Sequence, residues 1–316
     1  MRQISFEEIK SVVKVEDLFE PIRQSFIDYT TPRLIGIPAS MLYFSGDADV
    51  HIKSAALEGY EYFSIKVASM FPDNVEMNLS PYSGAIFLFD AKTGEPRAIL
   101  NDRGYLTDLR TAAAGACITD FAAPHEANKV ALIGTGMQAW HQLLALDKLR
   151  RIEHLIIYGR SKDKAKALGN KFQKALPDLT FSVAHSAEQA VKSAEIILAT
   201  TSSKSPIVKG EWLSKGQHIT AVGADDTHKH EIDAGCFEKA DVIFLDSLEL
   251  NLQYGEYSHA ILKDPALVEK TMEFGQAFQH EAPNDPNTIS VAKLVGVGVQ
   301  DLAAATLVMD KLIGGE

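Results

Sequence analysis

Mostly apolar runs alternate with helix-like segments from residue 129 onward. The runs are KVALIG, HLIIYG, TFSVAH, EIILATT, HITAVGA and DVIFLD, within residues 129–246. Strands that are apolar on both sides are typical of a parallel sheet with both faces covered. Because helical segments lie between several of these runs, the pattern predicts an α/β fold with a doubly wound parallel sheet.

The first part of the chain has a different pattern. Residues 6–29 have helical spacing, and Ser5 with Glu8 forms a capping box at their start. Residues 33–70 carry short β-like runs, and SGAIFLFDAKTGEPRAILND predicts a hairpin around AKTGEP. A further helix is expected over 105–122, where a run of Ala and Gly indicates tight packing. This part is therefore expected to be helical with an antiparallel or mixed sheet.

The last part of the chain turns helical after about residue 250. Its closing segment, TISVAKLVGVGVQDLAAATLVMDKL, joins a glycine-rich β-like stretch to an amphipathic helix. We expect this segment to return to the first domain. A chain of 316 residues exceeds what one compact core usually holds, so two domains are expected.

Composition and charge narrow the class of protein. The chain is 46% hydrophobic and 23% charged, with a net charge of −11, and its one dense basic stretch reads as a single helix face at 159–174. An acidic chain without a basic patch is not expected to bind nucleic acid. Two distant cysteines, no secretory signal and no apolar run of roughly 18–20 residues predict a reduced, cytoplasmic protein without a membrane span.

The turn GTGMQA, residues 134–139, carries the clearest chemistry. Gly134 would make the tight turn, Gly136 would admit a pyrophosphate to the backbone, and Ala139 would let helix and strand pack closely. The turn follows a strand and opens a helix, which is the context that dinucleotide binding needs. We expect the cofactor to be bound by this turn and the ends of the next strands: Gly134, Thr135, Gly136, Met137, Gln138, Ala139, Arg160, Ser161, Thr200, Thr201, Val222 and Gly223.

The end of the second strand bears on the choice of cofactor. An NAD-specific site would place Asp or Glu there, but this chain has Gly159, Arg160, Ser161 and Lys162. Arg160 could stack on adenine and meet a 2′-phosphate together with its neighbours. We therefore favour NADP(H), with NAD(H) as the alternative if Arg160 is solvated or stacks without discriminating.

Six stretches, spread in order over nearly the whole chain, resemble the ornithine cyclodeaminase/mu-crystallin family. They are ADVHIKSAAL, FSIKVAS, LTDLRTAAAGA, ALIGTGMQA, VGADDTHKHEID and GVGVQDLA. Within the family they look closest to ectoine-utilisation-type homologues and to imine or ketimine reductases. The resemblance implies a homodimer, bound NAD(P), and a small α-amino, α-imino or α-keto acid substrate bound in a cleft between two domains.

The resemblance also implies how the domains are divided. Residues 1–123 plus 295–316 would form a discontinuous α+β domain that binds substrate and pairs its sheets across the dimer. Residues 124–294 would form an inserted, Rossmann-type NAD(P)-binding domain.

Two basic residues match the family's substrate-binding positions. Arg110 aligns with the arginine that grips the substrate carboxylate, and a guanidinium near a helix start suits that role. Lys66, alone among apolar residues on a predicted strand, aligns with the lysine that contacts the carboxylate or the imine or keto end. The alternatives are a structural ion pair of Arg110 with a residue such as Asp108, and a snorkelling strand-edge lysine at position 66.

Asp225, directly after a predicted strand, aligns with the family's catalytic aspartate. It could pair with the substrate nitrogen and relay its proton. Asp226 is the competing candidate. The acidic and histidine-rich stretch DDTHKHEID is read as a loop at the start of a helix, so we expect no metal site.

Lys53 departs from the family pattern, because ornithine cyclodeaminase carries a glutamate at the corresponding place. A lysine would repel the side-chain ammonium of ornithine and could attract a second carboxylate, unless it points to solvent. Arg33 lies near the family's other carboxylate-binding arginine, in an uncertain register.

The best interpretation is an NAD(P)H-dependent reductase of small imino or ketimino acids, or an amino-acid dehydrogenase. Hydride would go to a C=N carbon next to a carboxylate, with Lys66, Arg110 and Asp225 as the catalytic set. A cyclodeaminase that recycles its NAD internally is the alternative. A non-catalytic protein that binds NADPH and a small ligand is a second alternative.

Overall fold

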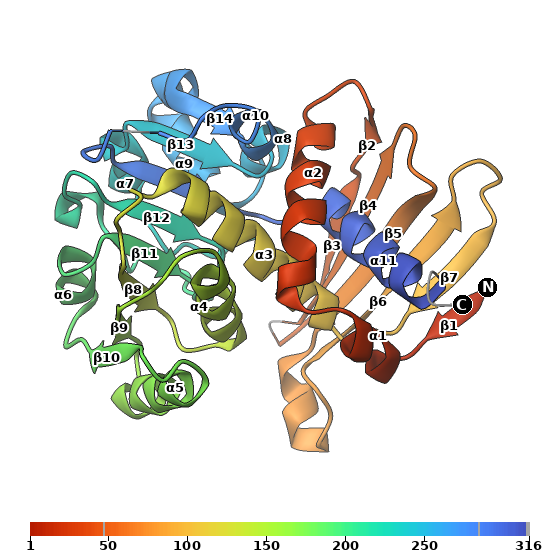
Figure 1. Ribbon diagram of the computed structural model, residues 1–316, viewed down its shortest axis with the longest axis horizontal. Coiled ribbons are helices and arrows are strands. Elements are labelled where there is room, and N and C mark those ends of the chain that lie inside the picture. The colour runs from red at the N-terminus through yellow and green to blue at the C-terminus, as the bar shows by residue number, and fades with distance from the viewer. Residues whose placement is uncertain (47, 284, 314–316) are drawn as a thin grey trace. The chain divides into compact units, whose positions relative to one another are not determined.

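A computed structural model describes residues 1–46, 48–283 and 285–313 (Figure 1). The chain divides into two compact units, Met1–Arg110 with Val297–Glu316, and Thr111–Gly296. The first division lies inside the helix α3 (Tyr105–Ala122), and the division that the family resemblance implies lies after that helix.

The first unit is built on a mixed sheet. Its strands are β1 (Arg2–Ile4), β2 (Leu34–Gly36), β3 (Ala39–Tyr43), β4 (Asp49–Leu57), β5 (Tyr62–Met70), β6 (Tyr82–Asp90) and β7 (Pro96–Leu100). They lie in the order β1-β7-β6-β5-β4-β2, and β3 also pairs with β4. All pairs are antiparallel except β1 with β7, and the expected hairpin is β6–β7.

The opening helix is broken in two, unlike the single helix expected over 6–29. Helix α1 (Phe6–Val12) has the expected capping box of Ser5 and Glu8, but Val13 is extended. A 3₁₀ turn (Val15–Leu18) follows and leads into α2 (Phe19–Tyr29). The Asp17 carboxylate accepts the backbone N–H of Lys14 at 2.8 Å, which starts a second helical segment.

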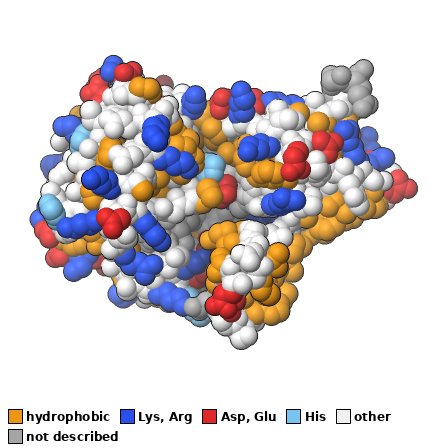
Figure 2. All heavy atoms as spheres, turned by 90° about the horizontal axis from the view of Figure 1, so that it is seen from below, with side chains coloured by type: hydrophobic (Ala, Val, Ile, Leu, Met, Phe, Trp, Pro, Cys, Tyr) orange, Lys and Arg blue, Asp and Glu red, His pale blue; other side chains and the backbone are white. Residues whose placement is uncertain are grey.

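The two faces of this sheet differ. Helix α11 (Gly298–Ile313) packs over β4 and β5, and a Cβ at Gly298 would lie 2.3 Å from the Ser54 carbonyl oxygen. The opposite face carries partly exposed apolar side chains, and Figure 2 shows hydrophobic side chains gathered on the side of the picture that holds this unit. They include Val50, Ile52, Phe63, Ile65, Val67, Phe87 and Ile99.

The small residues of α3 are explained by its packing. Ala112, Ala113 and Ala114 are fully buried. A Cβ at Gly115 would lie 2.1 Å from Oε1 of Gln142, whose amide donates to the Thr111 carbonyl at 2.9 Å. The helix is thus pressed against its neighbour at the expected place.

The second unit is the predicted parallel sheet. Its strands are β8 (Lys129–Ile133), β9 (His154–Tyr158), β10 (Thr180–Val183), β11 (Ile196–Ala199), β12 (His218–Ala221), β13 (Val242–Leu245), β14 (Thr271–Glu273) and β15 (Ser290–Lys293). All the pairs are parallel, in the order β10-β9-β8-β11-β12-β15-β13-β14. The order reverses between β8 and β11, and ligands of open α/β sheets bind at such a point.

Two details of this sheet concern the last part of the chain. Strand β15 is inserted between β12 and β13, inside the range 124–294 expected for the NAD(P)-binding domain, although the closing segment as a whole was expected to return to the first domain. Only the helix after it, α11, belongs to the first unit. The short strand β14 also interrupts the region expected to be helical.

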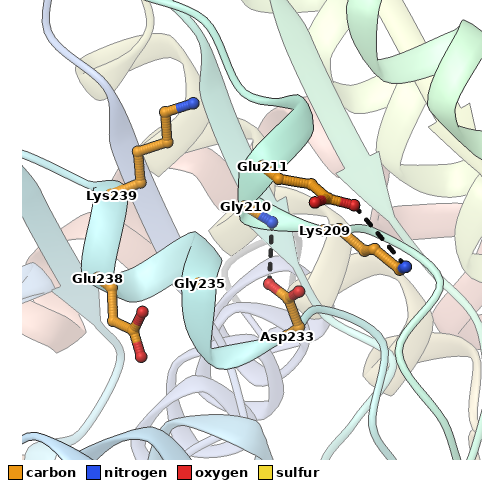
Figure 3. A pocket seen from close by; sticks show the side chains of 7 residues that line it. All are labelled: Lys209, Gly210, Glu211, Asp233, Gly235, Glu238 and Lys239. Atoms are coloured by element: carbon orange, nitrogen blue, oxygen red, sulfur yellow. Dashed lines mark hydrogen bonds and ion pairs between the residues drawn. The ribbon is translucent and has the colours of Figure 1, made fainter.

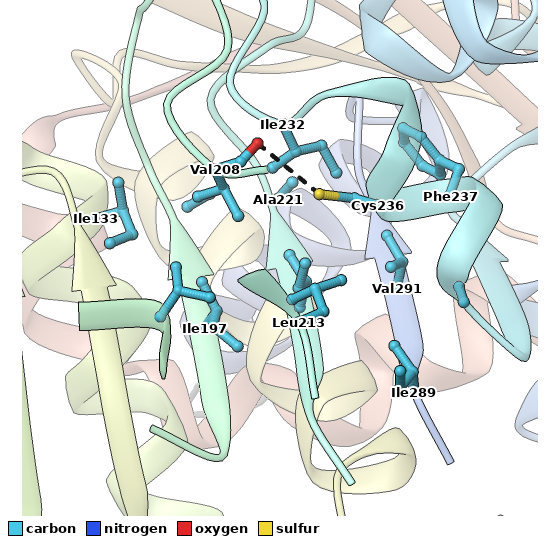
Figure 4. Close-up of a cluster of buried hydrophobic side chains, with 14 of the residues drawn as sticks. Ile133, Ile197, Val208, Leu213, Ala221, Ile232, Cys236, Phe237, Ile289 and Val291 are labelled. Carbon is cyan, nitrogen blue, oxygen red and sulfur yellow. Dashed lines mark hydrogen bonds between the residues drawn. The ribbon is translucent and has the colours of Figure 1, made fainter. Parts of the chain in front are cut away.

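Helices surround the parallel sheet and cover its core. They are α4 (Met137–Leu149), α5 (Lys162–Ala175), α6 (Ala187–Lys192), α7 (Ala234–Lys239), α8 (Leu248–Asn251), α9 (Gly255–Lys263) and α10 (Phe274–Ala277), with 3₁₀ turns at Gly210–Trp212 and Pro265–Lys270. A further 3₁₀ turn, Pro72–Met77, belongs to the first unit. Figure 4 shows part of the core, where Ile197, Val291 and Phe237 are fully buried. Cys236 lies in this core, where burial raises the pKa of its thiol.

Candidate active site

Three basic side chains are buried together in the first unit. Lys53 on β4 and Lys66 on β5 are directly opposite each other in the antiparallel register. Both lie on the sheet face that α11 covers, and they are 6% and 3% exposed. Arg110 of α3 is 3% exposed. Basic side chains are rarely buried this deeply without an anionic partner.

The partner is Asp301, on the first turn of α11. Nζ of Lys66 lies 3.0 Å from Oδ1 and 2.9 Å from Oδ2 of this carboxylate. Nε of Arg110 donates to Oδ1 at 3.0 Å, and its Nη1 donates to Oε1 of Gln300 at 2.8 Å. Arg110 therefore forms an ion pair with an acidic residue of the chain, as the structural alternative proposed, and that residue is Asp301. Sequence reasoning missed Asp301 and Gln300, although both lie in the quoted stretch GVGVQDLA.

The charged groups of this cluster shift one another's pKa values. Burial, and then the Arg110 charge, lower the pKa of Lys66 to about 7, against the attraction of Asp301. Burial raises the pKa of Asp301, but Arg110 and Lys66 outweigh it and hold that pKa below its usual value. Lys66 and Arg110 thus share one ionised aspartate, and Lys53 lies opposite Lys66 in the strand pair. The arrangement suits a small anion, which would offset the repulsion among the basic groups.

Asp102 lies just before the start of α3. It is buried, and burial raises the pKa of its carboxyl group. Its Oδ2 accepts the backbone N–H of Leu106 at 2.9 Å, so it caps the start of α3.

Arg33 is not brought to this cluster. Its side chain is 59% exposed, and Nη1 lies 3.3 Å from Oδ1 of Asp28. The same aspartate accepts the Tyr60 hydroxyl at 2.8 Å. Arg33 is therefore held near the end of α2 by Asp28, and the proposed site does not include it.

The glycine-rich turn of the second unit has two different glycines. Gly134 has a φ of +123°, and a Cβ there would lie 2.6 Å from Oγ1 of Thr200, so the chain itself requires this glycine. A Cβ at Gly136, the N-cap of α4, would meet nothing within 4 Å. Packing within the chain does not require Gly136, and the open space beside it fits a bound phosphate group.

A pocket of about 840 Å³ surrounds this turn. Seven of the predicted cofactor residues line it, namely Gly134, Thr135, Gly136, Arg160, Ser161, Thr200 and Thr201. Ile133, Tyr158, Gly159, Lys164, Ser202, Ser203, Lys204, Ser205 and Ile207 complete the lining, which does not include Met137, Gln138, Ala139, Val222 or Gly223. Its size falls in the range of small-molecule and cofactor sites.

The end of β9 contributes positive charge to this pocket. Gly159 is required here, because a Cβ would lie 2.7 Å from Cγ2 of Thr135. Arg160 follows, and the Ser161 hydroxyl accepts the backbone N–H of Lys164, which caps α5. No carboxylate occupies residues 159–162. Arg160 and Lys164 line the pocket beside the N-terminus of α5, and this positive charge suits an anionic ligand group.

Asp225 and Asp226 have different surroundings. Oδ1 of Asp226 accepts the backbone N–H of His228 and of Lys229, at 2.7 and 2.8 Å, and its side chain is 7% exposed. Asp225 is 33% exposed, and its Oδ1 lies 2.6 Å from Nζ of Lys229. Asp226 therefore shapes the loop, and Asp225 is the better candidate for contact with a ligand. Lys229 was missed by sequence reasoning.

A second hollow, of about 590 Å³, lies around Gly210 and α7 (Figure 3). Several of its charged groups contact each other or the backbone. Nζ of Lys209 lies 3.8 Å from Oε1 of Glu211, and Oδ1 of Asp233 accepts the backbone N–H of Gly210 at 2.9 Å.

Over residues 1–46, 48–283 and 285–313, no group of three His, Cys, Asp or Glu side chains could hold a metal ion. No described helix is long and apolar enough to cross a membrane.

The parallel sheet and its glycine-rich turn define an α/β protein of the dinucleotide-binding class. Within that class, the chain belongs to the ornithine cyclodeaminase/mu-crystallin family, whose model matches residues 3–316. An uncharacterized cyclodeaminase of Sinorhizobium fredii is 33% identical over 319 residues, which cover 98% of this chain and 96% of that protein.

Two solved structures extend the comparison. An archaeal alanine dehydrogenase dimer with bound NAD has a TM-score of 0.90 and 27% identity, covering 99% of this chain and 96% of its own. The iminosuccinate reductase of Paracoccus denitrificans in complex with NAD⁺ has a TM-score of 0.89 and 27% identity, covering 100% of this chain and 97% of its own.

Proposed function

We propose that this protein is an NAD(P)H-dependent reductase of small imino or ketimino acids, acting in reverse as an amino-acid dehydrogenase. The buried basic cluster of Lys53, Lys66 and Arg110, in which Lys66 and Arg110 contact Asp301, carries this proposal. A similar reductase and a similar dehydrogenase, both with bound NAD, support it.

The basic cluster would grip the substrate by its carboxylate. Arg110 offers a planar guanidinium, which binds carboxylates through paired hydrogen bonds, and Lys66 adds a charge beside it. Lys53, across the strand pair from Lys66, could take a second carboxylate. We therefore expect dicarboxylic imino acids to be favoured over monocarboxylic ones. The name of the iminosuccinate reductase agrees with this preference.

The chemistry needs a hydride and a proton. When bound, the nicotinamide cofactor supplies the hydride that goes to the C=N carbon. Asp225 would hold and relay the proton of the substrate nitrogen. Oδ1 of Asp225 lies 2.6 Å from Nζ of Lys229, and a carboxylate can accept a hydrogen bond from a protonated nitrogen.

The first experiment follows the loss of absorbance of NADH and NADPH at about 340 nm. The substrates are pyruvate, glyoxylate and oxaloacetate with ammonia or methylamine, and the cyclic imines pyrroline-2-carboxylate and piperideine-2-carboxylate. Oxidation of NADH or NADPH with any of them supports the reductase. If the rate is highest with oxaloacetate plus ammonia, the result also supports the role of Lys53.

The alternatives give different results. A cyclodeaminase would release ammonia from ornithine or a similar diamino acid with no net change in NADH. This alternative is retained because the family includes ornithine cyclodeaminase in its name. The charge of Lys53 argues against it for ornithine. Tight NADPH binding without turnover of any of these compounds would favour the binding protein.

We further propose that NADP(H) is preferred over NAD(H). Arg160, Lys164 and the N-terminus of α5 line the pocket where a 2′-phosphate would be recognised. We expect Arg160→Ala to weaken NADPH binding about tenfold and to leave NADH binding within about twofold. Fluorescence titration with each cofactor measures this, and Arg151→Ala, at an 80% exposed arginine, is the control. Tighter binding of NADH by the unaltered protein would contradict the preference.

Anion binding is expected to weaken as the pH rises. The pKa of Lys66 is about 7, so the side chain is charged below pH 7 and loses its charge above it. The dissociation constant of an unreactive carboxylate such as succinate should therefore rise up to about tenfold per pH unit above 7. Calorimetric titration from pH 6 to 8.5 measures it. Lys66→Arg keeps its charge and should give a flat profile. An equally flat profile for the unaltered protein would refute the role of Lys66.

We also propose the division of labour between the two parts of the chain. Residues 1–123 with 295–316 would bind substrate and form the dimer, and residues 124–294 would bind the cofactor. The partly exposed apolar face of the mixed sheet would pair with that of a second copy, as an apolar face of this kind marks an interface. A mass in solution of twice 34.5 kDa, measured by light scattering, is expected.

A further inference from the structure

A buried carboxylate joins two turns at the end of the parallel sheet. Glu231 is 1% exposed, and its Oε1 accepts the backbone N–H of Thr201. Its Oε2 accepts the backbone N–H of Gly223 at 2.6 Å. Thr201 follows strand β11 and Gly223 follows strand β12. One side chain therefore holds the carboxyl ends of two neighbouring strands.

The two turns are in direct contact. A Cβ at Gly223 would lie 2.0 Å from the carbonyl oxygen of Thr201 and 2.7 Å from its nitrogen. Thr201 lines the pocket around the glycine-rich turn. Any change in the distance between these two turns therefore changes the wall of that pocket.

The same network fixes the segment that carries Asp225. Oε1 of Glu256 accepts the backbone N–H of Glu231 at 3.0 Å, and its Oε2 lies 2.9 Å from Nζ of Lys293. Lys293 also donates to the carbonyl oxygen of Ala224 at 2.6 Å. Ala224 directly precedes Asp225, so the buried groups tie the cofactor pocket to the proposed catalytic aspartate.

Folding alone does not account for the charge on Glu231. Glu256 and Lys293 already form a buried pair of opposite charges, and Glu231 adds a further buried carboxylate beside them. Burial, and then Glu256, raise the pKa of Glu231 to about 7, which means that its ionised form is disfavoured here. Its two hydrogen bonds to backbone N–H groups are therefore made at the cost of a disfavoured buried charge.

We propose that Glu231 is a positioning residue for the dinucleotide, because its two carboxylate oxygens hold the Thr201 turn against the Gly223 turn and set the shape of the pocket. The proposal rests on the proposed function only in taking this pocket as the NAD(P)H site. Glu231 itself acts through the backbone of Thr201 and Gly223.

The test is Glu231→Gln, with Glu195→Gln as the matched control. A glutamine has one acceptor oxygen and turns an N–H₂ group toward the other backbone N–H, so one of the two bonds is lost. Glu195 directly precedes β11, and its Oε2 accepts the N–H of Asn128 and of Lys129 at 2.9 and 3.0 Å. It also accepts two backbone N–H groups, at the opposite end of the same strand, but through one oxygen, so a glutamine there can keep both bonds.

We expect Glu231→Gln to raise the dissociation constants of NADH and NADPH at least tenfold, measured by fluorescence titration. KM for the cofactor should rise in parallel, kcat at saturating cofactor should stay within about threefold, and Tm should be unchanged or modestly lower, because one buried N–H loses its acceptor while a disfavoured buried charge is removed. Glu195→Gln should leave cofactor binding within about twofold. Gly223→Ala, which forces the two turns apart, should weaken cofactor binding as well and serves if Glu231→Gln does not fold.

Three results would overturn the proposal, and they are distinguishable. Unchanged cofactor binding in Glu231→Gln removes the positioning role alone. An equal loss of cofactor binding in Glu195→Gln does the same. Failure of the unaltered protein to bind NADH or NADPH removes the pocket assignment, and with it both this inference and the proposed function.

Discussion

Arg110→Ala should lower kcat/KM for the imino-acid substrate by at least about a thousandfold, and it should leave the dissociation constant of NADH within about twofold. A thousandfold loss corresponds to about 4 kcal/mol, which is the scale of a buried, paired guanidinium–carboxylate contact that is removed completely. Arg110 also donates to Asp301 and Gln300, so the substitution weakens the arrangement that holds Lys66. Steady-state kinetics and cofactor titration on the same preparation measure the two quantities.

Two further variants show whether the effect belongs to the guanidinium. Arg110→Lys keeps a positive charge but loses the paired hydrogen bonds, so a loss of about a hundredfold is expected. Arg33→Ala removes an arginine that pairs with Asp28 outside the cluster and should change kcat/KM less than about threefold. If Arg110→Ala abolishes cofactor binding while substrate affinity holds, the carboxylate role of Arg110 is wrong.

Asp301→Asn is expected to destabilise the fold by about 3–5 kcal/mol, because it leaves buried basic groups without their counter-charge. Asp301 is fully buried and contacts both Lys66 and Arg110. Urea denaturation measures the free energy of unfolding. Asp310→Asn, on the exposed side of the same helix α11, is the matched control and should change it by less than about 0.5 kcal/mol.

The pH and an added anion give this prediction a sharper form. Lys66 can lose its proton at high pH, so the loss of stability should be larger at pH 6 than at pH 9. A dicarboxylate such as succinate should raise the Tm of Asp301→Asn more than that of the unaltered protein, since it replaces the missing negative charge. A loss that is independent of pH and of anions would mean that Asp301 acts through packing only.

The sequence identified the elements whose pattern is local. Apolar runs predicted strands β8 to β13, and the glycine-rich turn was placed correctly between β8 and α4. The break after α1 was missed, because the apolar spacing continues through it and only the Asp17 cap interrupts the helix. The place of β15 depends on which strands pair across the sheet, and a pattern along one strand does not specify its neighbours.

The candidate site was predicted where a residue is out of place in its own segment. Lys66 and Lys53 are charged residues in apolar strands, and Arg110 precedes a run of alanines. Asp301 was missed because an acidic residue in the first turn of a helix is ordinary, and its burial arises only when α11 covers β4 and β5. Glu231 was missed for a similar reason, since its partners are backbone N–H groups that no sequence motif encodes.

The position of α11 at the end of the chain has a consequence for biosynthesis. The ribosome makes the strands that carry Lys53 and Lys66 first, then the whole parallel sheet, and only afterwards the helix that carries Asp301. Until α11 emerges, the mixed sheet has neither its cover nor the carboxylate that compensates its basic groups. The nascent protein therefore completes its parallel sheet while the mixed-sheet unit is still unfinished. A chain that stops after β15 would have the complete parallel sheet but a mixed sheet without α11.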